Sequence, residues 1–130
     1  MKVDLAQVEC LFQLGADEII AAQIEGDPPR MGNRNAHVAP RAVVATADPE
    51  TFLAVVATNS AEWLGLCGIL GRPEWAQDAG LATPAGRNER ADEIEAALAG
   101  WARPRSAQAA ADILQAAGVP VKPGGVTEAL

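Results

Sequence analysis

The sequence predicts an α+β fold: a mainly helical small domain with one short antiparallel β-hairpin, preceded by a long flanking helix. Three observations lead to this prediction. Apolar residues recur at helical spacing in four stretches, each bounded by capping residues, glycine or proline. Two short runs rich in valine, threonine and alanine are separated by a turn signal. The 130 residues, 49% hydrophobic and 21% charged, suffice for one globular domain with a modest core.

The flanking helix is predicted within residues 1–28. Asp4 can cap its start, with Gln7 three residues later in a capping-box arrangement, and Gly26 closes it. The prolines that follow at positions 28 and 29 cannot continue a helix. Its apolar residues lie at helical spacing and include Leu5, Val8, Leu11, Phe12, Ile19 and Ile20.

The β-hairpin is predicted from residues 42–47 and 52–57. Both runs are rich in residues that favour strands, and Asp48-Pro49-Glu50 between them is a turn signal. The runs are almost continuously apolar, which is typical of strands covered on both faces. We therefore expect helices to pack on both faces of this hairpin.

Three helices complete the small domain, which we assign to residues 29–123. Asn59 and Glu62 form a capping-box pair that opens the first helix. Thr83 and Ser106 are predicted caps of the second and third helices. The second helix carries an apolar stripe formed by Ile94, Ala97, Leu98 and Trp101.

The chain end is predicted to hold one short strand and a tail. Residues 119–121 are typical of an edge strand, where proline is tolerated. Residues 124–130 depart from any regular pattern, and we expect this tail to be partly disordered.

Composition excludes several classes of partner. The net charge of −7 argues against nucleic acid, whose recognition needs a basic face. No apolar run approaches the length of about 18 residues that a membrane span needs, and no signal-peptide pattern is present, so we expect a cytoplasmic protein.

Cys10 and Cys67 each lie in an apolar helical pattern, which predicts buried free thiols.

The sequence offers no catalytic or metal-binding set. Its one histidine, His37, has no triad partners in the pattern, and two scattered cysteines do not make a zinc site. The glycines match neither a P-loop nor a dinucleotide-binding fingerprint. The acidic string Glu89, Asp92, Glu93 and Glu95, with Arg87 and Arg90 nearby, is typical of a solvated helix face with local ion pairs.

The segment 32–37 is the one polar loop that merits attention, because it holds the only histidine. Loops on rigid scaffolds often carry binding groups, but a surface connector with a solvated histidine has the same composition. Trp63, Trp75 and Trp101 fall on or beside apolar stripes, so we expect them in the core.

The order of the short motifs along the chain is more informative than any one of them. From about Val3 to Pro123 it resembles the C-terminal half of the family III CoA-transferases, the carnitine dehydratase and bile-acid-inducible protein F family. The motifs are Pro29-Arg30-Met31-Gly32-Asn33-Arg34, Ala39-Pro40, the hairpin, Asn59 to Leu70, Gly71-Arg72-Pro73-Glu74-Trp75, Asp78, Leu81-Ala82-Thr83, Gly86-Arg87-Asn88 and residues 116–123.

This resemblance implies an activity that the chain does not carry alone. Such enzymes move CoA between carboxylic acids through an aspartate that attacks the thioester, or in one branch racemise acyl-CoA thioesters. The aspartate and most CoA contacts belong to a large Rossmann-like domain that precedes this region in the family. Family members form interlocked dimers, with each active site between the large domain of one subunit and the small domain of the other. The CoA thioester is a substrate, and no permanent cofactor is implied.

The resemblance also implies which residues meet the substrate. Residues 35–39 align with a glycine-rich flap that shields the intermediates in some transferases, although this chain has other residues in place of the glycines. The resemblance therefore implies that substrate is contacted by Asn35, Ala36, His37 and Val38, together with Asn59 at the start of the helix after the hairpin. Asn59 stands where the racemase branch has a glutamate, and an amide cannot exchange protons, which disfavours racemisation. Asn59 is equally suited to a purely structural role as a helix cap.

Three interpretations stay open at this point. The chain is part of a CoA-transferase and silent without its large domain, or a stand-alone module that completes an active site with a separate large-domain subunit, or a purely structural acidic domain. Under the first we expect an exposed apolar face on the flanking helix, through which a large domain or a second copy binds. That face consists of Leu11, Phe12, Ile19 and Ile20.

Overall fold

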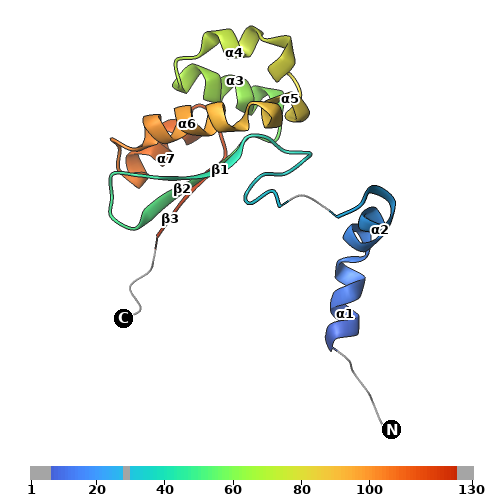
Figure 1. Cartoon of the computed structure of the whole chain (residues 1–130). Coiled ribbons are helices and arrows are strands. Elements are labelled where there is room, and N and C mark those ends of the chain that lie inside the picture. Colours follow the sequence, from blue (N-terminus) through green and yellow to red (C-terminus); the bar gives the residue numbers. More distant parts are fainter. Residues whose placement is uncertain (1–6, 28–29, 126–130) are drawn as a thin grey trace, which may run out of the picture. The chain divides into compact units, whose positions relative to one another are not determined.

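A computed structural model describes residues 7–27 and 30–125 of the chain (Figure 1). The chain divides into two compact units, Met1–Met31 and Gly32–Leu130. The second unit is an α+β domain in which helices outnumber strands, so the predicted fold class is confirmed.

The N-terminal unit holds two helices where the sequence predicted one. They are α1, Gln7–Leu14, and α2, Ala16–Glu25. Gly15 separates them with φ −102° and ψ 18°, although helical hydrogen bonds still run to and from it, so the break is a bend. Glycine lacks the Cβ that would hold it to helical geometry. Gly26, at φ 87°, closes α2 as predicted, whereas the predicted cap Asp4 lies outside the described residues.

The apolar side chains of this unit are exposed. Helix α2 has no buried residue, and Leu11, Phe12 and Ile20 each expose more than half of their surface. The prediction that both thiols are buried is therefore wrong for Cys10, which is exposed, and right for Cys67. The cause is that no other part of this unit covers the apolar side of its helices.

The second unit contains a three-stranded antiparallel sheet in the order β1-β2-β3. Strands β1, Arg41–Ala45, and β2, Thr51–Val56, form the predicted hairpin. Strand β3, Val121–Gly125, is an edge strand as expected, but it begins later than predicted and includes two glycines that the sequence analysis assigned to the tail. Val119, which we placed in that strand, is instead buried in the core.

The helices of the second unit follow the hairpin and lie on one side of the sheet (Figure 1). Their bounds are α3, Ser60–Ile69, α4, Pro73–Gln77, the 3₁₀ turn η1, Ala79–Leu81, α5, Pro84–Glu89, α6, Ala91–Ala102, and α7, Ala107–Ala116. The predicted caps Asn59, Thr83 and Ser106 all accept a hydrogen bond from the first turn of their helix. The predicted helix from Thr83 to Trp101 is interrupted at Arg90, whose φ of −110° and ψ of 25° separate α5 from α6.

Within the second unit, the described helices cover one face of the sheet. Burial alternates along β1, and helix α6 packs on β1 while α7 packs on β2 and β3. The prediction that helices cover both faces is therefore wrong: apart from Arg41, the outward residues of β1 and β2 are valine, alanine and phenylalanine, but no described helix of this unit lies over them. The run of apolar residues is continuous because both faces are apolar, not because both are covered.

The core lies between the inner face of the sheet and the helices. It includes Leu53, Leu66, Leu81, Ile94, Leu98 and Leu114, each at most 1% exposed. Trp63 and Trp75 are buried there and stack with ring centroids 6.1 Å apart, while Trp101 is partly buried against the same cluster. None of the helices that the structure describes is long and apolar enough to cross a membrane.

Candidate functional site

The polar loop before β1 has a defined turn although it contains no helix or strand. The Asn35 side-chain oxygen accepts hydrogen bonds from the backbone N–H groups of His37, at 2.8 Å, and Val38, at 3.2 Å. Asparagine favours such turns because its short side chain mimics a backbone carbonyl. The path of residues 35–38 is thus encoded by the first of them.

Two consecutive residues of α5 fasten both ends of this loop. The Asn88 side chain donates to the carbonyl of Asn35 at 2.8 Å, and Arg87 Nη1 donates to the carbonyl of Ala39 at 2.6 Å. Arg87 is 3% exposed and also donates to the carbonyls of Leu81, at 2.9 Å, and Ala82, at 3.0 Å. Backbone carbonyls from two segments therefore satisfy a buried cation, and the loop is part of that arrangement.

Burial places a further constraint on Arg87. Its guanidinium carbon lies 5.0 Å from the centroid of the Trp63 ring, where the aromatic face favours a cation. Burial lowers the pKa of Arg87, yet an arginine stays protonated because its ordinary pKa is so high. A lysine would present one compact ammonium in place of the planar fork that serves three carbonyls.

The close approach of α5 to η1 makes this arrangement possible. A Cβ on Gly86 would lie 1.7 Å from the Gly80 carbonyl oxygen, so only glycine fits there. The glycine that precedes Arg87 lets α5 lie against η1, within reach of its carbonyls.

A third attachment holds the loop at Arg34. Its guanidinium binds Glu95 through Nε at 2.8 Å and Nη2 at 2.9 Å, and also pairs with Asp92. These hydrogen bonds to Glu95 and Asp92 raise the pKa of Arg34. The acidic helix face is therefore paired with the loop and not only with its own neighbours, although Arg90 and Glu93 do form the expected local pair. Arg87, which we counted near that face, is instead buried.

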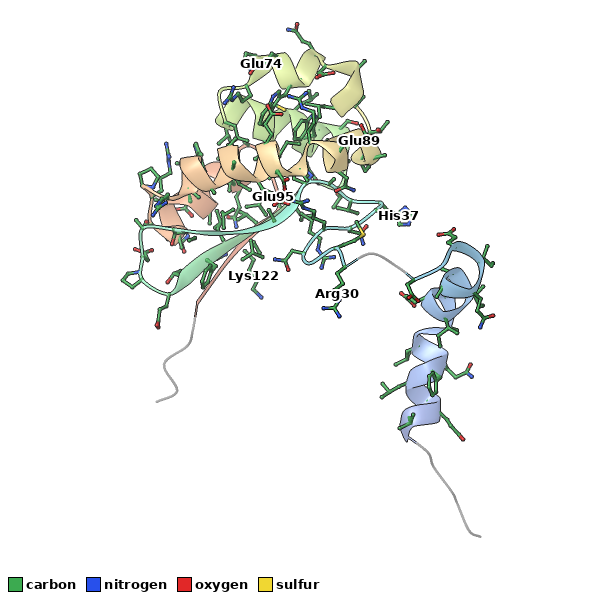
Figure 2. All side chains as sticks on the ribbon, in the orientation of Figure 1. Arg30, His37, Glu74, Glu89, Glu95 and Lys122 are labelled. Atoms are coloured by element: carbon green, nitrogen blue, oxygen red, sulfur yellow. The ribbon has the colours of Figure 1, made fainter. Side chains whose placement is uncertain are left out.

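The predicted site residues differ in where they lie. His37 and Ala36 are exposed, and Asn35 and Val38 are half-buried. Figure 2 shows the His37 ring at the tip of the loop, pointing away from the helices of the second unit. An exposed imidazole beside fastened backbone can meet a ligand that arrives from outside the unit.

Asn59 lies at the same end of the sheet as the loop. The Ala57 N–H donates to the Pro40 carbonyl at 3.0 Å, which joins the end of the loop to the segment that leads into α3. Both ends of the Asn59 amide are engaged by Glu62: the oxygen accepts from the Glu62 N–H at 3.0 Å and the nitrogen donates to the Glu62 carboxylate at 2.7 Å. Asn59 is thus a helix cap.

Glu62 completes this capping box from the other side. Its carboxylate accepts from the backbone N–H of Thr58 at 2.6 Å and from the Thr58 hydroxyl at 2.9 Å. These bonds, the backbone bond foremost, lower the pKa of Glu62, because they favour its charged form. The group is therefore an anion that serves the cap and has no tendency to act as a proton donor at neutral pH.

Sequence reasoning missed the roles of Arg87 and Asn88: Arg87 was placed beside the solvated acidic face, and Asn88 appeared only as part of a motif. A signal was present: Arg87 lies at helical spacing with Ala91, Ile94 and Leu98, all of which are buried. A charged residue on an apolar stripe indicates a cation with partners in the core. Among the described residues no group of three His, Cys, Asp or Glu could hold a metal ion.

Comparisons with known proteins identify the family of this chain. The family model of CoA-transferase family III matches residues 1–129. The formyl-CoA:oxalate CoA-transferases of Bradyrhizobium sp. (strain ORS 278) and of Bradyrhizobium diazoefficiens are each 28% identical over 99 residues, which cover 73% of this chain and 23% of each relative. The chain thus spans about a quarter of the length of these curated relatives.

Solved structures show the same fold. A CAIB/BAIF family protein from Brucella suis superimposes with a TM-score of 0.73 at 23% identity, over 98% of this chain and 33% of that one. Rv3272 from M. tuberculosis does so with a TM-score of 0.71 at 21% identity, over 97% of this chain and 32% of that one. The family inferred from the order of the motifs is confirmed: this chain belongs to CoA-transferase family III.

Proposed function

We propose that this chain is the small-domain part of an acyl-CoA:carboxylate CoA-transferase of the cytoplasm, and that residues 35–39 form its active-site loop. The observation that carries the proposal is the fastening of this loop, at Asn35 by Asn88 and at Ala39 by the buried Arg87. A loop without regular structure loses less entropy on meeting a ligand when its backbone is already fixed. The curated relatives, named as formyl-CoA:oxalate CoA-transferases, support a CoA thioester and a carboxylic acid as the two substrates.

In this proposal the loop shields the reacting thioester and does not attack it. The nucleophile is the family's aspartate, supplied by a large domain. It attacks the thioester carbonyl, forms a mixed anhydride and releases the CoA thiolate, which then returns to the aspartyl carbonyl as the acyl group leaves as its carboxylate. An acceptor carboxylate repeats these steps in reverse. Water would hydrolyse the anhydride, so a loop that covers it protects the reaction.

His37 is the residue we assign to substrate contact in this loop. Its exposed imidazole can donate a hydrogen bond to an acyl or acceptor carboxylate. Asn59 is assigned no proton transfer, because its amide cannot exchange protons and is engaged by Glu62. We therefore favour CoA transfer over racemisation.

A second candidate is a stand-alone module that completes an active site with a separate large-domain subunit. Such a module is expected to cover the apolar residues of its own N-terminal unit. Leu11, Phe12, Ile19 and Ile20 are instead each at least 40% exposed, which favours the first candidate. Such a surface suits association with a large domain or in a dimer. Both candidates predict that the chain alone is inactive.

The test is CoA exchange followed by mass spectrometry. The purified chain is incubated with formyl-CoA and oxalate, and with a panel of other acyl-CoA donors and acceptor acids, alone and together with a separately produced large domain of the family. We expect no exchange by the chain alone and exchange in the mixture, with the large domain alone as control. A His37→Ala chain should lower the rate in the mixture while binding the large domain as tightly as the unchanged chain. Robust exchange by the chain alone would overturn the proposal.

A further inference from the structure

The strand register arranges the outward residues of the sheet in three rows. The paired strands place Val43 beside Ala54 and Ala54 beside Lys122. The rows are Arg41–Val56–Pro120, Val43–Ala54–Lys122 and Ala45–Phe52–Gly124, and together they form what we call the outer sheet face. Val43 is 48% exposed and Phe52 is 46% exposed, so this face is apolar and open.

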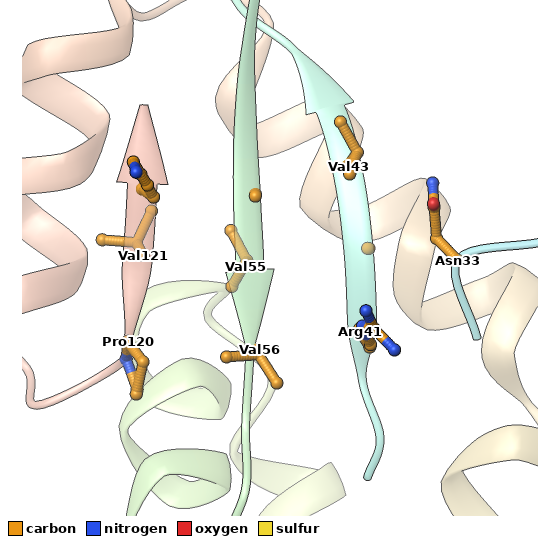
Figure 3. A pocket seen from close by; sticks show the side chains of 10 residues that line it. Asn33, Arg41, Val43, Val55, Val56, Pro120 and Val121 are labelled. Atoms are coloured by element: carbon orange, nitrogen blue, oxygen red, sulfur yellow. The ribbon is translucent and has the colours of Figure 1, made fainter. Parts of the chain in front are cut away.

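The outer sheet face is hollowed at its centre. Ala54 has a short side chain, while Val43, Val56 and Lys122 around it have longer ones. Two adjoining hollows of about 420 and 440 Å³ share Val43, Ala54 and Lys122, and the first also reaches Asn33 and Arg41. Figure 3 looks onto this face, with the strands in front and the helices behind them. The hollows form one shallow groove across the sheet.

The charges at the rim of the groove are unusual for this chain. The net charge is −7, yet the three rows contain Arg41 and Lys122 and no carboxylate. Arg34, Arg72 and Arg90 all form ion pairs, whereas neither Arg41 nor Lys122 pairs with any residue that the structure describes. Two cations, one on each outer strand, thus flank an apolar groove, and neither is neutralised by a carboxylate of the residues that the structure describes.

We propose that the outer sheet face is a docking surface for an acidic amphipathic helix of a partner protein. Three strands about 4.8 Å apart make a face about 10 Å wide, which matches the width of one helix. The helix would lay its apolar stripe over Val43, Phe52 and Ala54, and carboxylates on either side of that stripe would reach Arg41 and Lys122. Helices α6 and α7 already cover the inner face of the same sheet in this manner.

Charge argues against a second copy as the occupant. Two outer sheet faces brought together would oppose cations to cations, and like charges across an interface weaken it. Charge also gives the groove its selectivity. Any apolar helix could lie on valine and phenylalanine, but only an acidic helix places carboxylates beside both Arg41 and Lys122.

The probe is a synthetic helical peptide with leucine at positions i, i+3, i+4 and i+7 and glutamate on both sides of that stripe. Titrated into the isotope-labelled 130-residue chain, it should shift the NMR signals of Val43, Ala54 and Lys122. A twin peptide with lysine in place of glutamate should bind about tenfold more weakly or not at all. The double variant Arg41→Glu, Lys122→Glu should reverse this preference, binding the lysine peptide and rejecting the glutamate peptide.

Two further variants test whether binding occurs in the groove. Ala54→Glu, at an exposed position, should abolish binding by filling the groove while circular dichroism stays unchanged. Arg103→Glu, at an exposed cation that ends α6 on the helix side of the sheet, should leave the affinity as it is. Binding that does not respond to the charge reversals, or signal shifts confined to another surface, would overturn the proposal. So would concentration-dependent self-association through Val43 and Ala54 without peptide, because a second copy would then occupy the face.

Discussion

The N-terminal helices and the helices of the second unit carry similar apolar patterns, but only the second set is covered. Helix α6 buries Ala91, Ile94, Leu98 and Ala102 against the sheet. Helix α2 buries nothing, and Ile24 remains 78% exposed. Both patterns have helical spacing, so spacing identifies which side of a helix is apolar without identifying what covers it.

Short helices depend on tertiary contacts for their stability. Helices of 8 and 10 residues, such as α1 and α2, are marginal in water without tertiary contacts. Burying one leucine or isoleucine fully contributes about 1.5–3 kcal/mol. The second unit gains this contribution many times, whereas the apolar side chains of the N-terminal unit stay exposed and do not gain it. Three experiments test this difference between the two units.

The largest difference in unfolding free energy is expected between two leucine-to-alanine variants, one in each unit. Leu98→Ala removes a side chain that is 0% exposed and should lower the free energy of unfolding by about 2–5 kcal/mol. The matched change Leu14→Ala, at a residue 82% exposed, should alter it by less than about 0.5 kcal/mol. Urea unfolding followed by far-ultraviolet circular dichroism measures both, because helices of both units contribute to that signal. Equal costs would mean that the N-terminal unit is covered in solution.

Each unit holds one cysteine, so the labelling rates of the two thiols compare the exposure of the two units. Burial raises the pKa of the Cys67 thiol to about 11, so it stays protonated and inaccessible at pH 8, while Cys10 is exposed. We expect iodoacetamide to label Cys10 at least about a hundredfold faster than Cys67 in the native chain, and both at similar rates in urea. Peptide mass spectrometry assigns the label. Rapid native labelling of Cys67 would contradict the buried position of α3.

A smaller effect is expected from Arg87→Met, which tests whether Arg87 holds residues 35–39 to the rest of the second unit. The change removes hydrogen bonds to three carbonyls and should cost about 1–3 kcal/mol. The amide hydrogens of His37 and Val38 should then exchange faster, because one end of their loop is released. Arg103→Met, at an exposed arginine, is the control. Unchanged exchange in the loop would show that Asn88 and Arg34 hold it without Arg87.

Local signals predicted the elements well, because caps and turns depend on residues close in sequence. Asn59, Thr83 and Ser106 begin helices as expected, since each accepts a bond from an N–H three residues away. The bends at Gly15 and Arg90 were missed because the apolar spacing runs on through both. The open outer sheet face was missed because an apolar strand has the same composition whether one face or both are covered.

The candidate site was predicted in part for the same reason. Polarity located the loop, and Asn35 encodes its turn over a separation of three residues at most. The bond from Arg87 to Ala39 joins residues 48 apart in the sequence, and that from Asn88 to Asn35 joins residues 53 apart. Pairings at such separations follow from the packing of α5 against the loop, which no local pattern records.

The atoms that receive these two bonds have a consequence for protein engineering. Arg87 and Asn88 both bind backbone carbonyl oxygens, which every amino acid possesses. The side chains at positions 36, 37 and 38 take no part in this attachment, so they can be exchanged while the anchors stay in place. These three positions can therefore be randomised without redesigning the domain that carries the loop, and under the proposed function such variants would offer a different surface to the acyl group.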